Sequence, residues 1–94
     1  MAIKRAHIYV SGSVQGVWFR ATAQGVAIDG NLTGWVRNLR DGRVELVAEG
    51  AEEELEKLVQ WCAVGTDAAE VTDVAVTWSD PTHEFGAFLS GETA

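Results

Sequence analysis

A loop with two glycines, residues 11–17, precedes a segment with helical spacing, and Arg20 lies at the entrance of that segment. Such a loop can point backbone N–H groups inward, and the positive end of the helix dipole then favours a phosphate-sized anion. The planar guanidinium of Arg20 can bind two phosphoryl oxygens at once. Neither the Walker ending Gly-Lys-Ser/Thr nor the dinucleotide fingerprint Gly-x-Gly-x-x-Gly occurs. The pattern alone therefore indicates either an anion site or a turn glycine beside an exposed arginine.

Polar residues also surround a predicted hairpin turn at residues 40–42. Asn38 comes just before this turn, where asparagine is common for structural reasons. Arg37, Arg40 and Arg43 flank the same turn. These arginines either add positive potential near an anion or form a solvated edge.

The cysteine and the histidines have structural interpretations. Cys62 is the only cysteine, so it forms no internal disulfide and no cysteine-based zinc site. Its spacing places it on an apolar helix face, where cysteine behaves as a small hydrophobe. His7 and His83 have no metal-ligand spacing to each other or to a carboxylate cluster, so we expect structural or surface roles.

Length and composition predict one domain over residues 1–94, with 47% hydrophobic and 22% charged residues. No apolar run approaches the roughly 18 residues that span a membrane, so we expect a cytoplasmic protein without membrane contacts. Residues 1–43 contain six Lys or Arg and two Asp or Glu, whereas residues 44–94 contain one Lys and twelve Asp or Glu. The net charge of −7 argues against binding to nucleic acid or to anionic membranes.

The elements that must position the loop follow from hydrophobic spacing. Alternation from Ala6 to Val10 predicts a half-buried strand. A helix is expected from Phe19 or Arg20 to about Asp29, with Gly30 as its left-handed C-terminal residue. Gly25 lowers the stability of this helix by about 1 kcal/mol relative to alanine.

Two further strands are expected over residues 32–39 and 43–49. Asp41-Gly42 between them is a strong hairpin signal, because both residues tolerate positive φ. Leu55, Leu58 and Cys62 then follow helical spacing, with acidic residues 52–54 in the first turn and a glycine at position 65 closing the end.

The last third of the chain predicts a strand around residues 74–78, a short strand over 85–89 and a frayed tail at 91–94. The order βαββαβ predicts an α+β fold, the ferredoxin-like sandwich, with an antiparallel sheet, two helices on one face and a short extra C-terminal strand. This fold hosts many functions and decides none of them.

Two long segments resemble the signatures of the acylphosphatase family. The first is Val10-Ser-Gly-Ser-Val-Gln-Gly-Val-Trp-Phe-Arg20, and the second is Gly34-Trp-Val-Arg-Asn-Leu-Arg-Asp-Gly-Arg-Val-Glu45. Both occur in the family's order and spacing, and the resemblance covers about residues 5–65 strongly and the remainder loosely. The last strand lacks the basic residue that often follows it in the family.

The resemblance implies hydrolysis of the carboxyl–phosphate bond of small acyl phosphates by a monomeric enzyme without metal or organic cofactor. Arg20 corresponds to the phosphate-binding arginine, and Asn38 corresponds to the asparagine that positions the attacking water. The backbone phosphate cradle corresponds to Ser13, Val14, Gln15, Gly16, Val17, Trp18 and Phe19. Inorganic phosphate or sulfate would then compete with the substrate at this cradle.

Two other classes of function stay open at this point. A non-catalytic anion- or nucleotide-sensing module would keep the cradle and show no turnover. A binder of single-stranded RNA would need a basic, aromatic sheet face, which the net charge of −7 disfavours. An assay of phosphate release separates the first alternative from the enzyme, and a salt-dependent gel shift tests the second.

Overall fold

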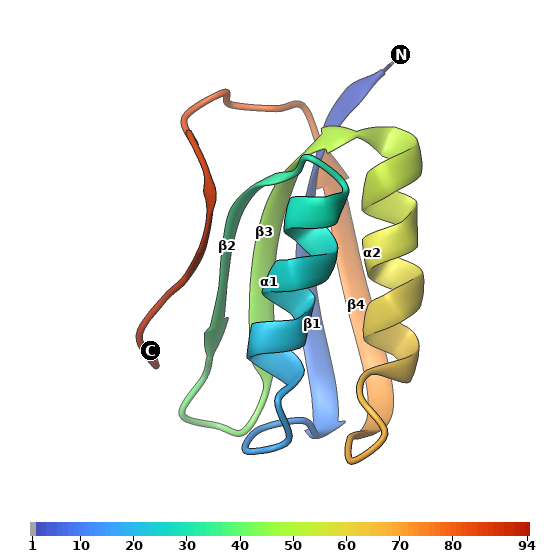
Figure 1. Ribbon diagram of the computed structural model, residues 1–94, viewed down its shortest axis with the longest axis vertical. Coiled ribbons are helices and arrows are strands. Elements are labelled where there is room, and N and C mark those ends of the chain that lie inside the picture. The colour runs from blue at the N-terminus through green and yellow to red at the C-terminus, as the bar shows by residue number, and fades with distance from the viewer. Residues whose placement is uncertain (1) are drawn as a thin grey trace.

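The computed structural model describes residues 2–94, which form a five-stranded sheet with two helices on one of its faces (Figure 1). Four neighbouring strand pairs join the sheet in the order β4-β1-β3-β2-β5. The arrangement confirms the predicted ferredoxin-like sandwich. The elements in chain order are β1 (Ile3–Ser13), α1 (Phe19–Asp29), β2 (Thr33–Asn38), β3 (Val44–Ala51), α2 (Glu52–Val64), β4 (Glu70–Ser79) and β5 (Phe88–Ser90).

The core lies between the helices and the inner face of the sheet. Alternate residues of β1, Ala6, Ile8 and Val10, are fully buried, and α2 adds Leu55 and Leu58 to the same cluster. Burial of one such leucine contributes about 1.5–3 kcal/mol to the free energy of folding. The apolar spacing of β1 and α2 therefore favours packing of the helix against this face of the sheet. The predicted bounds of α1 agree with the structure, and Cys62 lies in this core as expected.

The last strand corrects the expectation of a purely antiparallel sheet, because β5 pairs with β2 in parallel. Figure 1 shows the reason: β4 ends at the end of the sheet where β2 begins, and the chain crosses over that end to the opposite edge before it runs down beside β2. The strand is also shorter than predicted and begins at Phe88, whose side chain is buried.

The prediction of a frayed tail is also wrong, because residues 91–94 form backbone hydrogen bonds along the outer edge of β2. Gly91 N donates to Val36 O at 2.8 Å, and Ala94 N donates to Asn38 O at 3.0 Å. Arg40 N in turn donates to Ala94 O at 2.8 Å. Strand β2 has free backbone groups beyond the short β5, and the tail satisfies them.

Two turn residues differ from expectation. Gly30 has φ −86°, and Asn31 takes the left-handed conformation instead with φ 56°, which asparagine tolerates better than most residues. In the β2–β3 hairpin only Gly42 has positive φ, at 101°. Gly42 N donates to Leu39 O at 3.1 Å, so the connection is a turn followed by one left-handed glycine.

Candidate active site

Three connections meet at one end of the sheet: the β1–α1 loop, the β2–β3 hairpin and the α2–β4 connection (Figure 1). Gly12, next to the last residue of β1, has φ 126°, and a Cβ there would lie 2.1 Å from Glu70 O. Only glycine fits so close to a neighbouring backbone. Gly16, with φ 72°, supplies a second left-handed position, so both glycines allow the tight path that their spacing predicts.

A pocket of about 310 Å³ opens between this loop, the start of α1 and the end of β2. The volume lies at the small end of the range for ligand pockets, which suits a compact substrate. Arg20 and Asn38, far apart in sequence, both line it. The complete lining is Val14, Gly16, Trp18, Phe19, Arg20, Ala21 and Asn38.

The N-terminus of α1 faces this pocket with its positive partial charge uncompensated. In the described part of the chain, no side chain caps α1 and no acidic residue stands in its first turn, whereas α2 has three glutamates there. The first helical bond runs from Thr22 N to Trp18 O, so the N–H groups of residues 19–21 have no intrahelical partner. An anion is therefore favoured at this point.

Trp18, the residue before α1, has a left-handed backbone with φ 63° and an 80% exposed side chain. A bulky residue in this region is uncommon and strained. Trp18 is also one of the residues that line the pocket.

Asn38 is the last residue of β2, and its backbone carbonyl accepts the bond from Ala94 N. Among residues 2–94, Asn38 Oδ1 is the one buried side-chain polar atom without a hydrogen-bond partner. A buried acceptor left unpaired costs about 1–3 kcal/mol, so a donor that reached Oδ1 would recover this energy.

The guanidinium of Arg20 is half-buried and donates from Nη1 to Gly91 O at 3.3 Å. The tail therefore contacts the arginine side chain as well as the backbone of Asn38. The sequence contained no signal for this contact, because it depends on the parallel pairing of β5. Ala21 was also not predicted, although its place in the first turn of the predicted helix was a usable signal.

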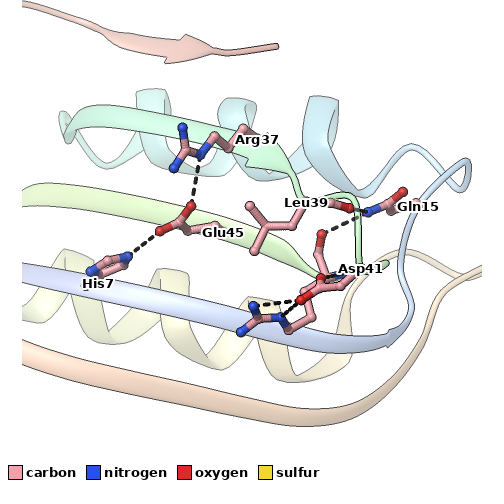
Figure 2. A network of polar contacts seen from close by, with 7 residues as sticks. His7, Gln15, Arg37, Leu39, Asp41 and Glu45 are labelled. Carbon is pink, nitrogen blue, oxygen red and sulfur yellow. Dashed lines mark hydrogen bonds and ion pairs between the residues drawn. The ribbon is translucent and has the colours of Figure 1, made fainter. Parts of the chain in front are cut away.

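The remaining loop residues of the predicted cradle do not line the pocket. Ser13 ends β1 opposite Glu70. The Gln15 side chain extends to the β2–β3 hairpin, as Figure 2 shows for its bond to Leu39. The Val17 carbonyl accepts a bond from Thr66 Oγ1 at 2.7 Å.

Two of the three arginines around the hairpin turn pair with carboxylates, and none of the three lines the pocket. Arg37 Nε donates to Glu45 Oε1 at 2.9 Å, and Arg43 Nε donates to Asp41 Oδ2 at 2.8 Å (Figure 2). Arg40 is exposed. The interpretation of these residues as an ion-paired, solvated edge therefore fits better than a role at the pocket.

Glu45 links Arg37 to His7, whose Nε2 lies 2.6 Å from Glu45 Oε2 (Figure 2). Burial raises the pKa of Glu45, but the bonds to His7 and Arg37 outweigh burial and hold this pKa below its ordinary value. His7 thus has the structural role that the sequence suggested.

Cys62 is fully buried, and burial raises the pKa of its thiol to about 12, so it is not a nucleophile at neutral pH. No group of three or more His, Cys, Asp or Glu side chains within residues 2–94 could hold a metal ion. Neither helix of that part of the chain is both long and apolar enough to cross a membrane.

Comparisons with known proteins agree on one family. The sequence model of the acylphosphatase family matches residues 6–89. An acylphosphatase of Pelotomaculum thermopropionicum is 52% identical over 94% of this chain and 96% of its own length. One of Haloarcula marismortui is 53% identical over 86% of this chain and 89% of its own. The crystal structure of acylphosphatase from Bacillus subtilis has a TM-score of 0.90 and 40% identity, covering 94% of this chain and 98% of that one.

The chain therefore belongs to the acylphosphatase family. Its activity is accordingly that of an acylphosphatase, a hydrolase. The resemblance of the two signature segments is confirmed by this membership.

Proposed function

We propose that this enzyme hydrolyses the carboxyl–phosphate bond of small acyl phosphates by direct attack of water in the pocket between α1 and β2. The phosphoryl group binds to Arg20 and to the backbone N–H groups of the loop and of the first turn of α1. Asn38 Oδ1 accepts a hydrogen bond from the attacking water and aims its lone pair at phosphorus. The observation that carries this proposal is that Asn38, whose buried Oδ1 has no partner, lines the same pocket as Arg20 and the uncapped start of α1.

The chemistry fits a site without a general acid. The leaving group is a carboxylate whose conjugate acid has a pKa near ~4, so it departs unprotonated at neutral pH. Phosphoryl transfer through a loose transition state needs positioning and charge neutralisation more than covalent help. The Arg20 guanidinium and the N–H groups supply positive charge where negative charge accumulates on the equatorial oxygens. Orientation of the water by Asn38 contributes several kcal/mol, up to roughly 7–11 in ideal systems.

Some finer features of the enzyme stay predictions. We propose that residues 1–94 act as one domain and as a monomer, and a cytoplasmic location rests on composition alone. Inorganic phosphate and sulfate are expected to compete with substrate, because they present the same oxygens to the same N–H groups.

The test is release of inorganic phosphate from acetyl phosphate, followed with and without added phosphate or sulfate. We expect turnover and competitive inhibition by both anions. Binding of phosphate without turnover would instead indicate the non-catalytic sensing module. Turnover that no concentration of either anion inhibits would exclude the pocket as the site of phosphoryl binding.

A further inference from the structure

One side chain connects the β1–α1 loop to the hairpin that follows Asn38. Gln15 Nε2 donates to Leu39 O at 2.7 Å and to Arg43 O at 2.9 Å. These carbonyls stand at the neck of the hairpin, which Leu39 N closes by donating to Arg43 O at 2.8 Å. Figure 2 shows Gln15 reaching from the loop toward this neck.

Gln15 is well suited to this bridge because its amide nitrogen has two N–H donors, and both are used. On the loop side its chain neighbours Val14 and Gly16 line the pocket, and on the hairpin side Leu39 directly follows Asn38. The bridge therefore spans from the phosphate side of the pocket to the water side.

A second contact holds the same loop without touching the hairpin. Thr66 Oγ1, in the α2–β4 connection, donates to Val17 O at 2.7 Å. The C=O and N–H of one trans peptide point in opposite directions, so this bond turns the Trp18 N–H away from Thr66. Thr66 thus contacts only the loop, whereas Gln15 joins the loop to the hairpin.

We propose that Gln15 is a positioning residue, whose side-chain amide fixes the distance between the bound phosphoryl group and the Asn38 carboxamide. This inference rests on the proposed function, in which Asn38 directs water at phosphorus. A misplacement of about 1 Å costs on the order of 100-fold in rate when a reaction depends on alignment. The bridge consequently serves the attack step and contributes little to anion affinity.

The experiment compares Gln15→Met, which keeps the length of the side chain and removes both donors, with Thr66→Val. For each we measure kcat on acetyl phosphate and the inhibition constant of inorganic phosphate. We expect Gln15→Met to lose about 10- to 100-fold in kcat with the phosphate inhibition constant within about threefold of wild type. Thr66→Val is expected to weaken phosphate inhibition by a larger factor than it lowers kcat.

Two further variants keep the result interpretable. Gln60→Met makes the same exchange at an exposed position of α2 and is expected to leave both constants unchanged. If Gln15→Met fails to fold, Gln15→Asn replaces it, since it keeps the donors on a shorter chain and is also expected to lower kcat selectively.

Three outcomes would overturn the inference. A variant at Gln15 that keeps kcat within twofold of wild type contradicts the bridge while leaving the proposed function intact. A Gln15 variant whose phosphate affinity and kcat fall by the same factor would show that Gln15 has a general structural role. A wild-type enzyme that binds phosphate without turning over acetyl phosphate contradicts both the inference and the proposed function.

Discussion

The guanidinium of Arg20 donates a hydrogen bond to the carbonyl of Gly91, 3.3 Å away. The residue proposed to bind phosphate is thereby in contact with a tail 71 positions further along the chain. That tail also pairs with the backbone of Asn38 through Ala94 N. Residues 91–94 thus contact both proposed site residues.

Deletion of residues 92–94 is expected to weaken phosphate inhibition by about tenfold, because the Gly91 carbonyl becomes a terminal carboxylate that competes for Arg20. The inhibition constant of phosphate measures the effect. Deletion of Ala94 alone is the control, since its new carboxylate lies farther along the tail, and we expect a change within about twofold. Equal effects of the two deletions would exclude the Arg20–Gly91 contact as the cause.

The buried carboxylate of Glu49 is expected to make the fold less stable in acid. Burial raises the pKa of its carboxyl, but bonds from Thr82 N at 2.9 Å, Arg5 Nη1 at 2.8 Å and His83 N at 2.9 Å outweigh burial and lower it to about 2. Because this folded-state pKa lies below the ordinary 4.5, ionised Glu49 stabilises the fold fully above pH 4.5. That contribution disappears as the pH falls from 4.5 toward 2.

The free energy of unfolding, measured against pH, checks this. Between pH 5 and 2 the wild type is expected to lose on the order of 2–3 kcal/mol more than Glu49→Gln. Glu84→Gln is a suitable control, because Glu84 contacts the same Arg5 but is 57% exposed. Parallel curves for wild type and Glu49→Gln would contradict the assignment.

Substitution by alanine is expected to change the free energy of unfolding in opposite directions at Gly12 and at Gly25. Gly12→Ala is expected to lower the free energy of unfolding by at least about 2 kcal/mol, because its Cβ would strike the Glu70 carbonyl. Gly25→Ala is expected to raise it by about 0.5–1 kcal/mol, because Gly25 lies inside α1 with nothing within 4 Å of a Cβ. Denaturant unfolding of both variants measures the difference, and a Gly12→Ala protein as stable as wild type would refute the close approach.

The elements that local spacing determines were predicted correctly in type and order, although β1 and β4 are longer than the predicted residues 6–10 and 74–78. The features that depend on the path of the chain were not predicted. The apolar positions of α2 and the alternation in β1 need no knowledge of distant partners. The direction of β5 and the pairing of the tail depend on where β4 ends, which no local pattern reveals. Asn31 rather than Gly30 takes positive φ because the last turn of α1 continues through Gly30.

The candidate site was predicted only with help from the family resemblance. Arg20 had a physical argument of its own, whereas Asn38 in isolation looked like an ordinary residue beside a turn. Its unpartnered Oδ1 is a property of the folded pocket. The bridging role of Gln15 likewise became visible only when the hairpin carbonyls were in place.

Cys62 is expected to resist alkylation in the folded enzyme. Its side chain is fully buried and the pKa of its thiol is raised to about 12, so both access and thiolate are lacking. Labelling with iodoacetamide at pH 8, followed by mass spectrometry, should proceed at less than about 1% of the rate in the unfolded chain. Rapid labelling of folded protein with full retention of activity would contradict the burial of Cys62.

The central claim is that the Asn38 carboxamide directs water at a phosphoryl group that other groups bind. The most direct test is kcat for acetyl phosphate in Asn38→Ala, with the inhibition constant of phosphate measured on the same folded protein. We expect kcat to fall by at least about 100-fold while the inhibition constant stays within about threefold. An Asn38→Ala enzyme with the kcat of the wild type would contradict the claim.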